Sequence, residues 1–415
     1  MPAGLWTALA GALAALALGA VACGGGDDDT PAGGPQTGSR TLTVYSSLPL
    51  HGTSRRQSQD MVNAIKLGLQ EAGGKVGGLT INYVSQDSAT AEAGEWTSDK
   101  VLENAREAVR DANTIAYIGD RDSAATALSL PLLNEGGVLQ ISPSSTYAGL
   151  TRPGGGRRGE PERFYPSALP TFGRVVPADH IQAAALVGYM RDERVRRLAI
   201  LHDRDLYGTG LADQVAAVAE DQGIEVVVTD AIDTSARDLS GPAGRVAQSG
   251  ADAFFFGGGT DSGAAEVLTA VGSADRSLKL FAPDAVAETA FAEAIPAAIA
   301  ARMRITSPTL QPRLLPAAAT RFHQLFRERF GRVAEPYAIF AYEAMRVVLQ
   351  SIADAGERGN VRRAVIDAFF AIEDRRSVLG TYSIDARGDT SLSTYAGRRV
   401  RGARLVFDKV LKVQT

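Results

Sequence analysis

The stretch IAYIGDRDSAATALSLPLLNEGGVLQISPSST, residues 115–146, decides the fold of this chain. Its pattern predicts a buried strand from Ile115, a helix that starts at Ser123, and a second buried strand from Val138. Parallel strands of such a βαβ unit end at the same edge of the sheet. We therefore expect the hydroxyl at the helix start and the hydroxyls after the second strand to lie close together. These residues are Ser123, Ser144, Ser145 and Thr146.

This group of hydroxyls suits a small anionic ligand. Ligands of open α/β sheets lie outside the carboxyl ends of the strands, where N–H groups at helix starts and short polar side chains converge. We interpret Ser123 and residues 144–146 as a cradle for a ligand that carries a carboxylate. An alternative stays open at this point, in which Ser123 is only a helix cap and residues 142–145 are only a turn.

The composition is that of a globular protein, and the length allows two lobes. The chain has 415 residues, of which 45% are hydrophobic and 22% charged, so it is long enough for two hydrophobic cores. Its formal net charge is −4. No nucleic-acid partner is expected, because binding to phosphates normally requires an excess of basic residues.

The N-terminus differs from the rest of the chain. Residues 3–22 carry no charge and lead into AVAC, which ends in the only cysteine, Cys23. This segment resembles a bacterial lipoprotein signal peptide, and the resemblance implies that Cys23 becomes the lipidated first residue of the mature protein. Two features depart from that motif: Ala20 replaces the usual Leu, and no Lys or Arg precedes Arg40. The alternative is an uncleaved anchor with a free cysteine.

Lipidation at Cys23 would place the protein outside the cytoplasmic membrane. Residues 24–40 are rich in Gly, Pro, Thr and Asp, which predicts a flexible tether between residues 1–23, the signal peptide with its lipidated Cys, and the folded part. A membrane partner is therefore expected through the lipid.

From Thr41 onward strands and helices alternate, which predicts mostly parallel sheets with helices on both faces. The Gly-rich and Pro-rich residues 152–171 interrupt the pattern and are expected to be an exposed insertion. A second series of βα units follows, and the later helices are more than that series needs, so we expect the chain to return to the first lobe. The expected lobes are residues 41–176 with 307–378, and residues 177–306 with 379–415.

Catalytic, metal and cofactor motifs do not fit this sequence. None of the four His lies in a serine-hydrolase elbow or a zinc-protease pattern, and no Cys, His and Asp cluster has metal-ligand spacing. The run GGGT, residues 257–260, matches neither phosphate-binding glycine motif. His202 and Asp203 at a strand end are the one pair that would allow an acid–base role. We expect neither an enzyme nor a cofactor.

Two residues that follow strands of the second series complete the candidate site. Asp284 suits an ammonium group, and Tyr207 can pack on an apolar body while its hydroxyl forms a hydrogen bond. Taken alone, Asp284 could equally cap the helix that follows.

The same residues carry a family resemblance. From about Thr41 to the C-terminus the chain resembles the type I periplasmic binding proteins, specifically the leucine/isoleucine/valine-binding branch that serves ABC importers. The matching segments include LPLHG at 48–52, GVLQISP at 137–143 and PD at 283–284. The resemblance implies two Rossmann-like lobes, joined by three crossover strands, that close on an amino acid.

That resemblance also implies roles for individual residues. Ser123, Ser145 and Thr146 would hold the α-carboxylate, with Thr146 also near the ammonium. Asp284 would bind the ammonium, and Tyr207 would form an aromatic wall.

Two positions depart from the branched-chain binders. Gln57 stands where they have an aromatic residue, and Gly259 stands where they have a tyrosine, so the side-chain pocket loses wall on two sides. Arg121 and Asp122, just before Ser123, either contact the ligand or pair with each other at the rim. These departures leave three alternatives open: a larger ligand, a more polar ligand, or none.

We therefore expect an extracytoplasmic, lipid-anchored solute-binding protein that delivers an amino acid or a related molecule to an ABC transporter permease. A second hypothesis is a ligand-binding sensory or co-receptor lipoprotein without a transport role. A third, an extracytoplasmic enzyme, requires a base near the cleft.

Overall fold

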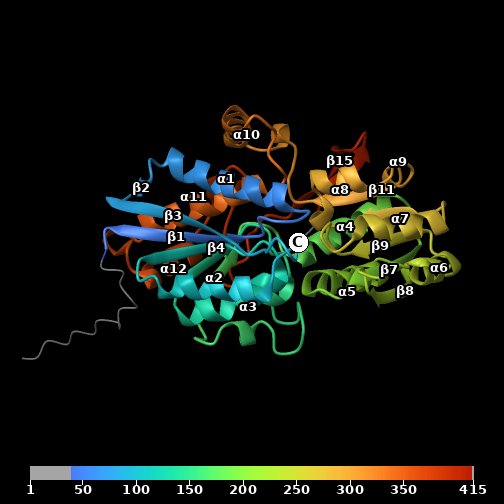
Figure 1. Cartoon of the computed structure of the whole chain (residues 1–415), viewed down its shortest axis with the longest axis horizontal. Coiled ribbons are helices and arrows are strands. Elements are labelled where there is room, and N and C mark those ends of the chain that lie inside the picture. Colours follow the sequence, from blue (N-terminus) through green and yellow to red (C-terminus); the bar gives the residue numbers. More distant parts are fainter. Residues whose placement is uncertain (1–38, 414–415) are drawn as a thin grey trace, which may run out of the picture. The chain divides into compact units, whose positions relative to one another are not determined.

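The computed structural model describes residues 39–413, and these form two mostly parallel β-sheets (Figure 1). The first sheet has the order β2-β3-β1-β4-β5-β6, and only the β2–β3 pair is antiparallel. Its strands are β1 (Thr41–Leu48), β2 (Lys75–Val76), β3 (Leu79–Asp87), β4 (Thr114–Gly119), β5 (Leu139–Ser142) and β6 (Phe172–Arg174).

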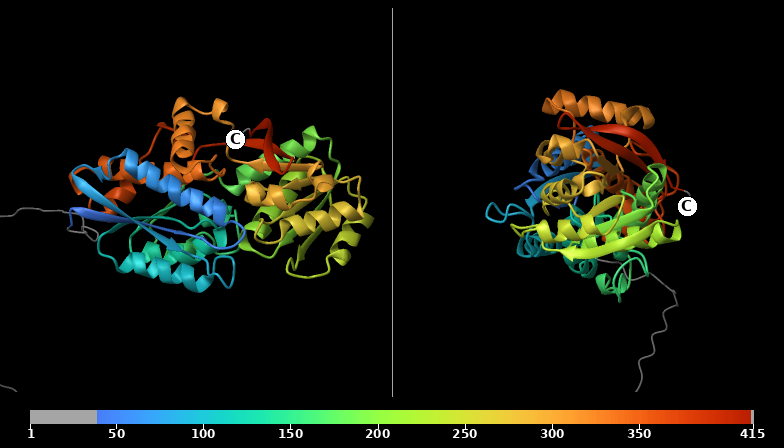
Figure 2. Two further views of the ribbon diagram at one scale, coloured as in Figure 1. Left: turned by 45° about the horizontal axis from the view of Figure 1, so that its top comes forward. Right: turned by 90° about the vertical axis from the view of Figure 1, so that its right-hand side faces the viewer.

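The second sheet has the order β15-β14-β11-β10-β9-β7-β8. Its two antiparallel pairs, β11–β14 and β14–β15, lie at one edge, where Figure 2 shows the C-terminal strands in red. Its strands are β7 (Arg197–Asp203), β8 (Glu225–Ile232), β9 (Ala253–Gly257), β10 (Lys279–Ala282), β11 (Met303–Ser307), β14 (Thr394–Arg401) and β15 (Arg404–Lys412).

Helices cover both faces of the first sheet. On one face α1 packs against α11, and their apolar side chains share one core with β1 and β4. On the other face α2 and α3 enclose a smaller core that includes Tyr45 and Tyr117. The helices are α1 (Arg55–Glu71), α2 (Ser98–Arg110), α3 (Ser123–Glu135), α10 (Ala317–Phe330), α11 (Ala338–Asp354) and α12 (Arg362–Phe370).

The second sheet is covered in the same way. Side chains of α4 and α5 form one core with β7 and β9, and side chains of α6 to α9 form the other with β9, β10 and β11. The helices are α4 (Asp179–Asp192), α5 (Leu206–Asp221), α6 (Ser240–Gln248), α7 (Ala264–Ala274), α8 (Thr289–Ala294) and α9 (Ala297–Ala300). Parallel strands buried on both faces read as continuous apolar runs, as in AFFF at 253–256.

The chain crosses between the two sheets three times: after β6, after β11, and before β14. Before the last crossing it forms a small hairpin of β12 (Arg375–Ser377) and β13 (Gly380–Tyr382). The predicted α/β class with two mostly parallel sheets is thus confirmed. Residues 1–38, and with them Cys23, lie outside the described residues.

The expected insertion is largely exposed, with two buried anchors. Glu160 is buried and accepts a hydrogen bond from the Tyr147 hydroxyl at 2.6 Å, and Phe164 packs in an apolar cluster with Phe172. The backbone carbonyl of Gly155 accepts a hydrogen bond from Gln214 of α5, so the insertion also contacts the second sheet's helices. No helix between residues 39 and 413 is both long and apolar enough to cross a membrane.

Candidate functional site

A pocket of about 420 Å³ opens where the carboxyl ends of strands from both sheets face each other. Its wall contains residues from the segments that follow β1, β3, β4 and β5 of the first sheet, and β7, β9 and β10 of the second. This is the place where open α/β sheets bind ligands, because helix starts and loop side chains converge there.

The structure brings most of the predicted site residues to this pocket. Its wall includes Gln57, Ser123, Ser144, Tyr207, Gly259 and Asp284. Ser145 and Thr146 do not line it, and both are almost completely buried.

The segment 142–146, here called the hydroxyl turn, uses most of its hydrogen-bonding groups internally. Ser142 Oγ donates to the Asp120 carbonyl at 2.7 Å and accepts from the backbone N–H groups of Ser144 and Ser145. Ser144 Oγ donates to the Arg121 carbonyl. Ser145 Oγ lies 2.6 Å from Thr126 Oγ1. These bonds fix the turn against the start of α3, as the alternative interpretation of this segment expects.

Ser123 is the first residue of α3, and Asp122 occupies the cap position without a side-chain cap bond. Ser123 Oγ accepts a hydrogen bond from the Tyr147 backbone N–H at 3.2 Å. Its own O–H therefore remains available to donate toward the pocket. The first N–H groups of a helix also lack intrahelical acceptors, so this corner of the pocket presents donors.

Asp284 is the most enclosed acid of the pocket wall. It follows β10 at the start of a short 3₁₀ turn and is 1% exposed. Tyr207 Oη and Gln182 Nε2 donate to Oδ1 at 2.5 and 2.7 Å, and Tyr337 Oη donates to Oδ2. Burial raises the pKa of Asp284, while the donors from Tyr207 and Gln182 oppose that shift. Because Tyr337 belongs to the core of the first sheet, its bond joins the two sides of the pocket.

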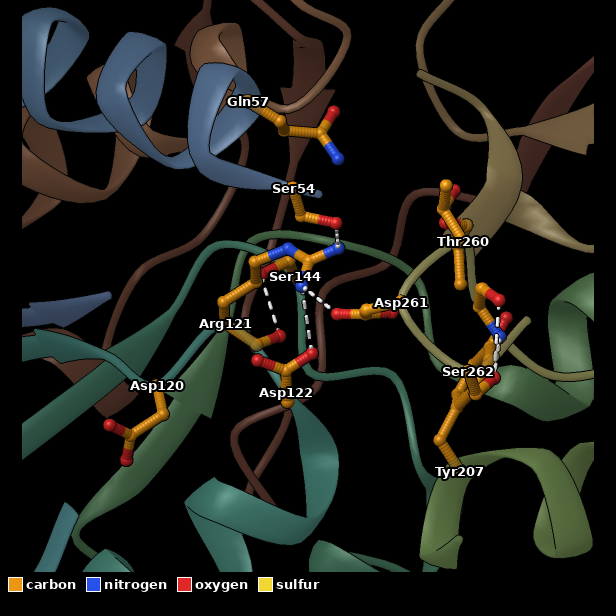
Figure 3. A network of polar contacts seen from close by, with 12 residues as sticks. Ser54, Gln57, Asp120, Arg121, Asp122, Ser144, Tyr207, Thr260, Asp261 and Ser262 are labelled. Carbon is orange, nitrogen blue, oxygen red and sulfur yellow. Dashed lines mark hydrogen bonds and ion pairs between the residues drawn. The ribbon is translucent and has the colours of Figure 1, made fainter. Parts of the chain in front are cut away.

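Arg121 lies between the two sheets rather than at a solvated rim (Figure 3). Its guanidinium is only 7% exposed; Nη1 is 3.1 Å from Asp122 Oδ1 and 2.9 Å from Asp261 Oδ2. Nη2 donates to Ser54 Oγ at 3.0 Å. Asp261 follows β9, so this ion pair connects the first sheet's segment to the second's.

Glu288 forms a further connection between the two sides. It accepts from Ser54 Oγ at 2.9 Å and from Gln57 Nε2 at 3.2 Å, and it is almost completely buried. Burial raises its pKa to about 7, although the nearby Arg121 charge opposes that rise. Gln57 is therefore held by an acid of the opposite side, in place of the aromatic residue that the family resemblance implies.

Gly259 makes room for an acid. A Cβ at this position would lie 2.7 Å from Asp261 Oδ1, so any side chain at residue 259 would require Asp261 to move. The absence of a tyrosine here does not simply enlarge the pocket, because the Asp261 carboxylate fills part of the space.

Several wall residues were not predicted from the sequence. Glu95 and Trp96 come from the loop after β3, Asp205 follows β7, and Tyr337 directly precedes α11. The rule that pockets form at the carboxyl ends of strands would have indicated the first three. Tyr337 gave no such signal, because it reaches the pocket from a segment far along the chain.

Only one residue of the pair His202 and Asp203 lines the pocket. Asp203 lines the pocket, whereas His202 does not, and its Nδ1 lies 3.3 Å from Thr209 Oγ1. Burial lowers the pKa of His202. The two side chains therefore do not form a base and its orienting group at the pocket.

Two lobes of this topology with a polar pocket between them define a class of ligand-binding proteins. A family model described as periplasmic binding protein matches residues 44–402. The chain belongs to this family, whose members bind ligands outside the cytoplasm and are not enzymes.

Individual relatives are distant but cover most of the chain. The Leu/Ile/Val-binding protein BraC3 of Rhizobium johnstonii is 23% identical over 382 residues, which is 88% of this chain and 93% of that protein. The crystal structure of the leucine binding protein LivK from Thermotoga maritima has a TM-score of 0.76 at 18% identity, covering 89% of this chain and 99% of that one.

A solute binding protein of an ABC transporter from R. palustris, solved in complex with benzoate, has a TM-score of 0.74 at 17% identity. It covers 90% of this chain and 96% of that one. These similarities confirm the fold and the predicted resemblance, and the expectation that the chain is not an enzyme agrees with the family.

Proposed function

We propose that this protein is the solute-binding component of an ABC importer and closes around an amino acid or an amino-acid-like molecule. The observation that carries the proposal is the pairing of donors and acceptors across one pocket. Ser123 and the start of α3 present donors on one side, and Asp284 presents a carboxylate on the other. A zwitterion has the complementary groups.

The carboxylate of the ligand would lie at the start of α3. The Ser123 hydroxyl and the first N–H groups of this helix point donors toward an anion, and the helix dipole adds a partial positive charge there. Ser144, on the same side, already donates its hydroxyl to the Arg121 carbonyl, so it would contribute an acceptor rather than a donor.

The ammonium of the ligand would lie at Asp284. Tyr207 and Gln182 hold one oxygen of this carboxylate from the second sheet's side, and the Tyr337 hydroxyl holds the other from the first. An ammonium would replace the Tyr337 bond most readily, because that bond breaks when the two sides separate. The ring of Tyr207 would pack along the ligand's carbon chain.

Closure of the two sides around the ligand follows from the same contacts. At the pocket, Arg121 with Asp261, and Ser54 and Gln57 with Glu288, hold the sides together by polar bonds. Polar contacts of this kind exchange with water at modest net cost, which suits a hinge that opens and closes.

The anchor and the transporter partner rest on the sequence. The lipoprotein-like segment that ends at Cys23 supports attachment to the outer face of the cytoplasmic membrane through a lipid, and the family resemblance supports delivery of the solute to a permease. The ligands of the relatives, Leu/Ile/Val for one and benzoate for another, indicate which solutes to test first.

Isothermal titration calorimetry of the purified chain tests the proposal. Amino acids, their amides and benzoate would be titrated separately. We expect at least one α-amino acid to bind with a Kd of about 1 μM, in the range typical of a small ligand enclosed by a polar pocket. The proposal fails if no amino or carboxylic compound binds.

A further inference from the structure

The pocket wall carries far more negative than positive charge. Six carboxylates and a single guanidinium line it: Glu95, Asp122, Asp203, Asp205, Asp261, Asp284 and Arg121. The guanidinium pairs with two of these acids, Asp122 and Asp261, and cannot balance the others. A narrow space lined by charge of one sign raises the local concentration of solutes with the opposite charge.

Four of these acids form no ion pair among the described residues. One is Asp284, whose donors are described above, and the other three are Asp203, Asp205 and Glu95; only Asp205 has its pKa lowered by a nearby cation, Arg157. Asp203 accepts from the Ser262 hydroxyl at 2.5 Å and from the Asp205 backbone N–H at 3.2 Å. Asp205 accepts from the Tyr207 backbone N–H at the start of α5. Glu95 accepts from no group between residues 39 and 413. These neutral donors supply no positive charge to the wall.

Glu95, Asp205 and Asp261 influence one another, although they come from three different loops. Burial raises the pKa of Glu95, and the charges of Asp261 and Asp205 raise it further. Burial also raises the pKa of Asp205, with a further contribution from Asp261. A positive group placed between the three would interact favourably with all of them at once.

A separate observation points to a ligand with N–H donors. Gln57 lines the pocket and is 1% exposed, yet its Oε1 has no hydrogen-bond donor among the described residues. Glu288 fixes the orientation of this amide, because Nε2 must face the carboxylate and Oε1 must face away from it. A buried acceptor without a donor costs about 1–3 kcal/mol, so a donor from a ligand is favoured there.

The geometry favours an organic cation over a metal ion. Among residues 39–413 no group of three or more His, Cys, Asp or Glu side chains is arranged to hold a metal. The carboxylates are instead spread over several loops around the pocket, which suits an extended molecule with more than one charged nitrogen.

We infer that the pocket selects a solute with a second positively charged nitrogen, such as an amino acid with a basic side chain. This nitrogen lies among Glu95, Asp205 and Asp261, and Gln57 Oε1 accepts a hydrogen bond from the same solute. The inference rests on the proposed function, in which Ser123 and Asp284 hold the carboxylate and the α-ammonium.

Isothermal titration calorimetry of the purified chain with three matched ligands tests the second-cation inference. Lysine carries the second cation, norleucine has a similar side chain without it, and cadaverine keeps both nitrogens without the carboxylate. We expect lysine to bind at least about tenfold more tightly than norleucine. Raising NaCl from about 50 to about 500 mM should weaken lysine binding more than norleucine binding, because salt screens exposed charges.

The outcomes separate the two proposals. Norleucine binding as tightly as lysine would overturn the second-cation inference and leave the proposed amino-acid function standing. Cadaverine binding more tightly than lysine would support the second-cation inference and overturn the carboxylate role of Ser123. If none of lysine, norleucine, cadaverine, leucine and benzoate bound, both the proposed function and the second-cation inference would be overturned.

A matched pair of variants locates the second cation. Glu95→Gln keeps the size of the side chain and removes its charge, and no hydrogen bond to a described residue is lost. We expect about fivefold weaker lysine binding and unchanged norleucine binding. Glu92→Gln, on the same loop but outside the pocket wall, is the control and should change neither. Equal loss for both ligands in Glu95→Gln, or no loss, would overturn the assignment.

Discussion

The hydroxyl turn and the acidic wall, which is formed by Glu95, Asp203 and Asp205, both border the pocket. They differ in the partners of their polar groups. In the hydroxyl turn, the hydroxyls donate to backbone carbonyls of their own lobe; they belong to Ser142, Ser144 and Ser145. In the acidic wall, Glu95, Asp203 and Asp205 form no ion pair with a described cation. A polar residue near a pocket is thus a weak indication of ligand contact until its other bonds are counted.

Of the substitutions considered for the pocket, removal of Arg121 should have the largest effect. Its guanidinium is the only cation of the wall and lies among Asp122, Asp261 and the nearby Glu288. Arg121→Met would leave buried carboxylates uncompensated, so we expect a loss of about 3–5 kcal/mol in the free energy of unfolding at neutral pH. Urea unfolding followed by circular dichroism measures it. Arg158→Met in the exposed insertion is the control, and an equal loss there would contradict the argument.

Asp284→Asn tests the acid that the proposed function uses. We expect about 100-fold weaker binding of an amino acid, because its ammonium loses a charged acceptor, and little change for benzoate, which has no amine. Calorimetry with both ligands measures this difference. Equal loss for both would mean that Asp284 only supports the structure through Tyr207, Gln182 and Tyr337.

Two serines of the predicted site separate ligand contact from turn structure. Ser123→Ala should weaken amino-acid binding about tenfold with little change in stability, because Ser123 lines the pocket and its hydroxyl only accepts a bond from the Tyr147 backbone. Ser145→Ala should lower the free energy of unfolding by about 1–2 kcal/mol, because Ser145 Oγ bonds to the Asp120 carbonyl and Thr126. Calorimetry measures ligand binding and urea unfolding measures stability for both variants. Weaker binding in Ser145→Ala and lower stability in Ser123→Ala would contradict these roles.

The acidic wall should also make stability depend on pH. Burial raises the pKa of Asp203 to about 7, the Ser262 bond lowers it, and the charge of Asp205 raises it again. A carboxyl group whose pKa is higher in the folded than in the unfolded state destabilises the fold as pH rises toward and past the folded value.

Asp203→Asn removes that ionisation. The variant should therefore gain about 1 kcal/mol relative to the wild type at about pH 8, and little at about pH 4. Thermal unfolding at both pH values compares the two proteins. A gain of the same size at both would mean that the charge of Asp203 is not the cause.

The sequence was most informative where a residue's place follows from its own strand. Apolar runs followed by hydroxyl or acidic residues predicted that Ser123, Tyr207 and Asp284 would lie together, and they do. Which hydroxyls face the pocket could not be predicted, since Ser144 and Ser145 differ only in the partners that the fold brings to them.

Contacts between distant segments of the chain could not be predicted from the sequence either. Arg121 meets Asp261 only after two sheets have formed and faced each other, so local pattern allowed only a pair with Asp122. Tyr337 reaches Asp284 from a helix start that belongs to the other side of the pocket. Such contacts depend on how the lobes face each other, which no local periodicity encodes.

Gly259 leaves the Asp261 carboxylate free to lie where it does. A Cβ at residue 259 would come 2.7 Å from Asp261 Oδ1, and the carboxylate, as the end of a flexible side chain, would have to turn away. That movement would disturb the ion pair of Asp261 with Arg121 Nη1, which joins the two sides of the pocket. A directed-evolution library that varies residue 259 should therefore be screened for stability as well as for specificity.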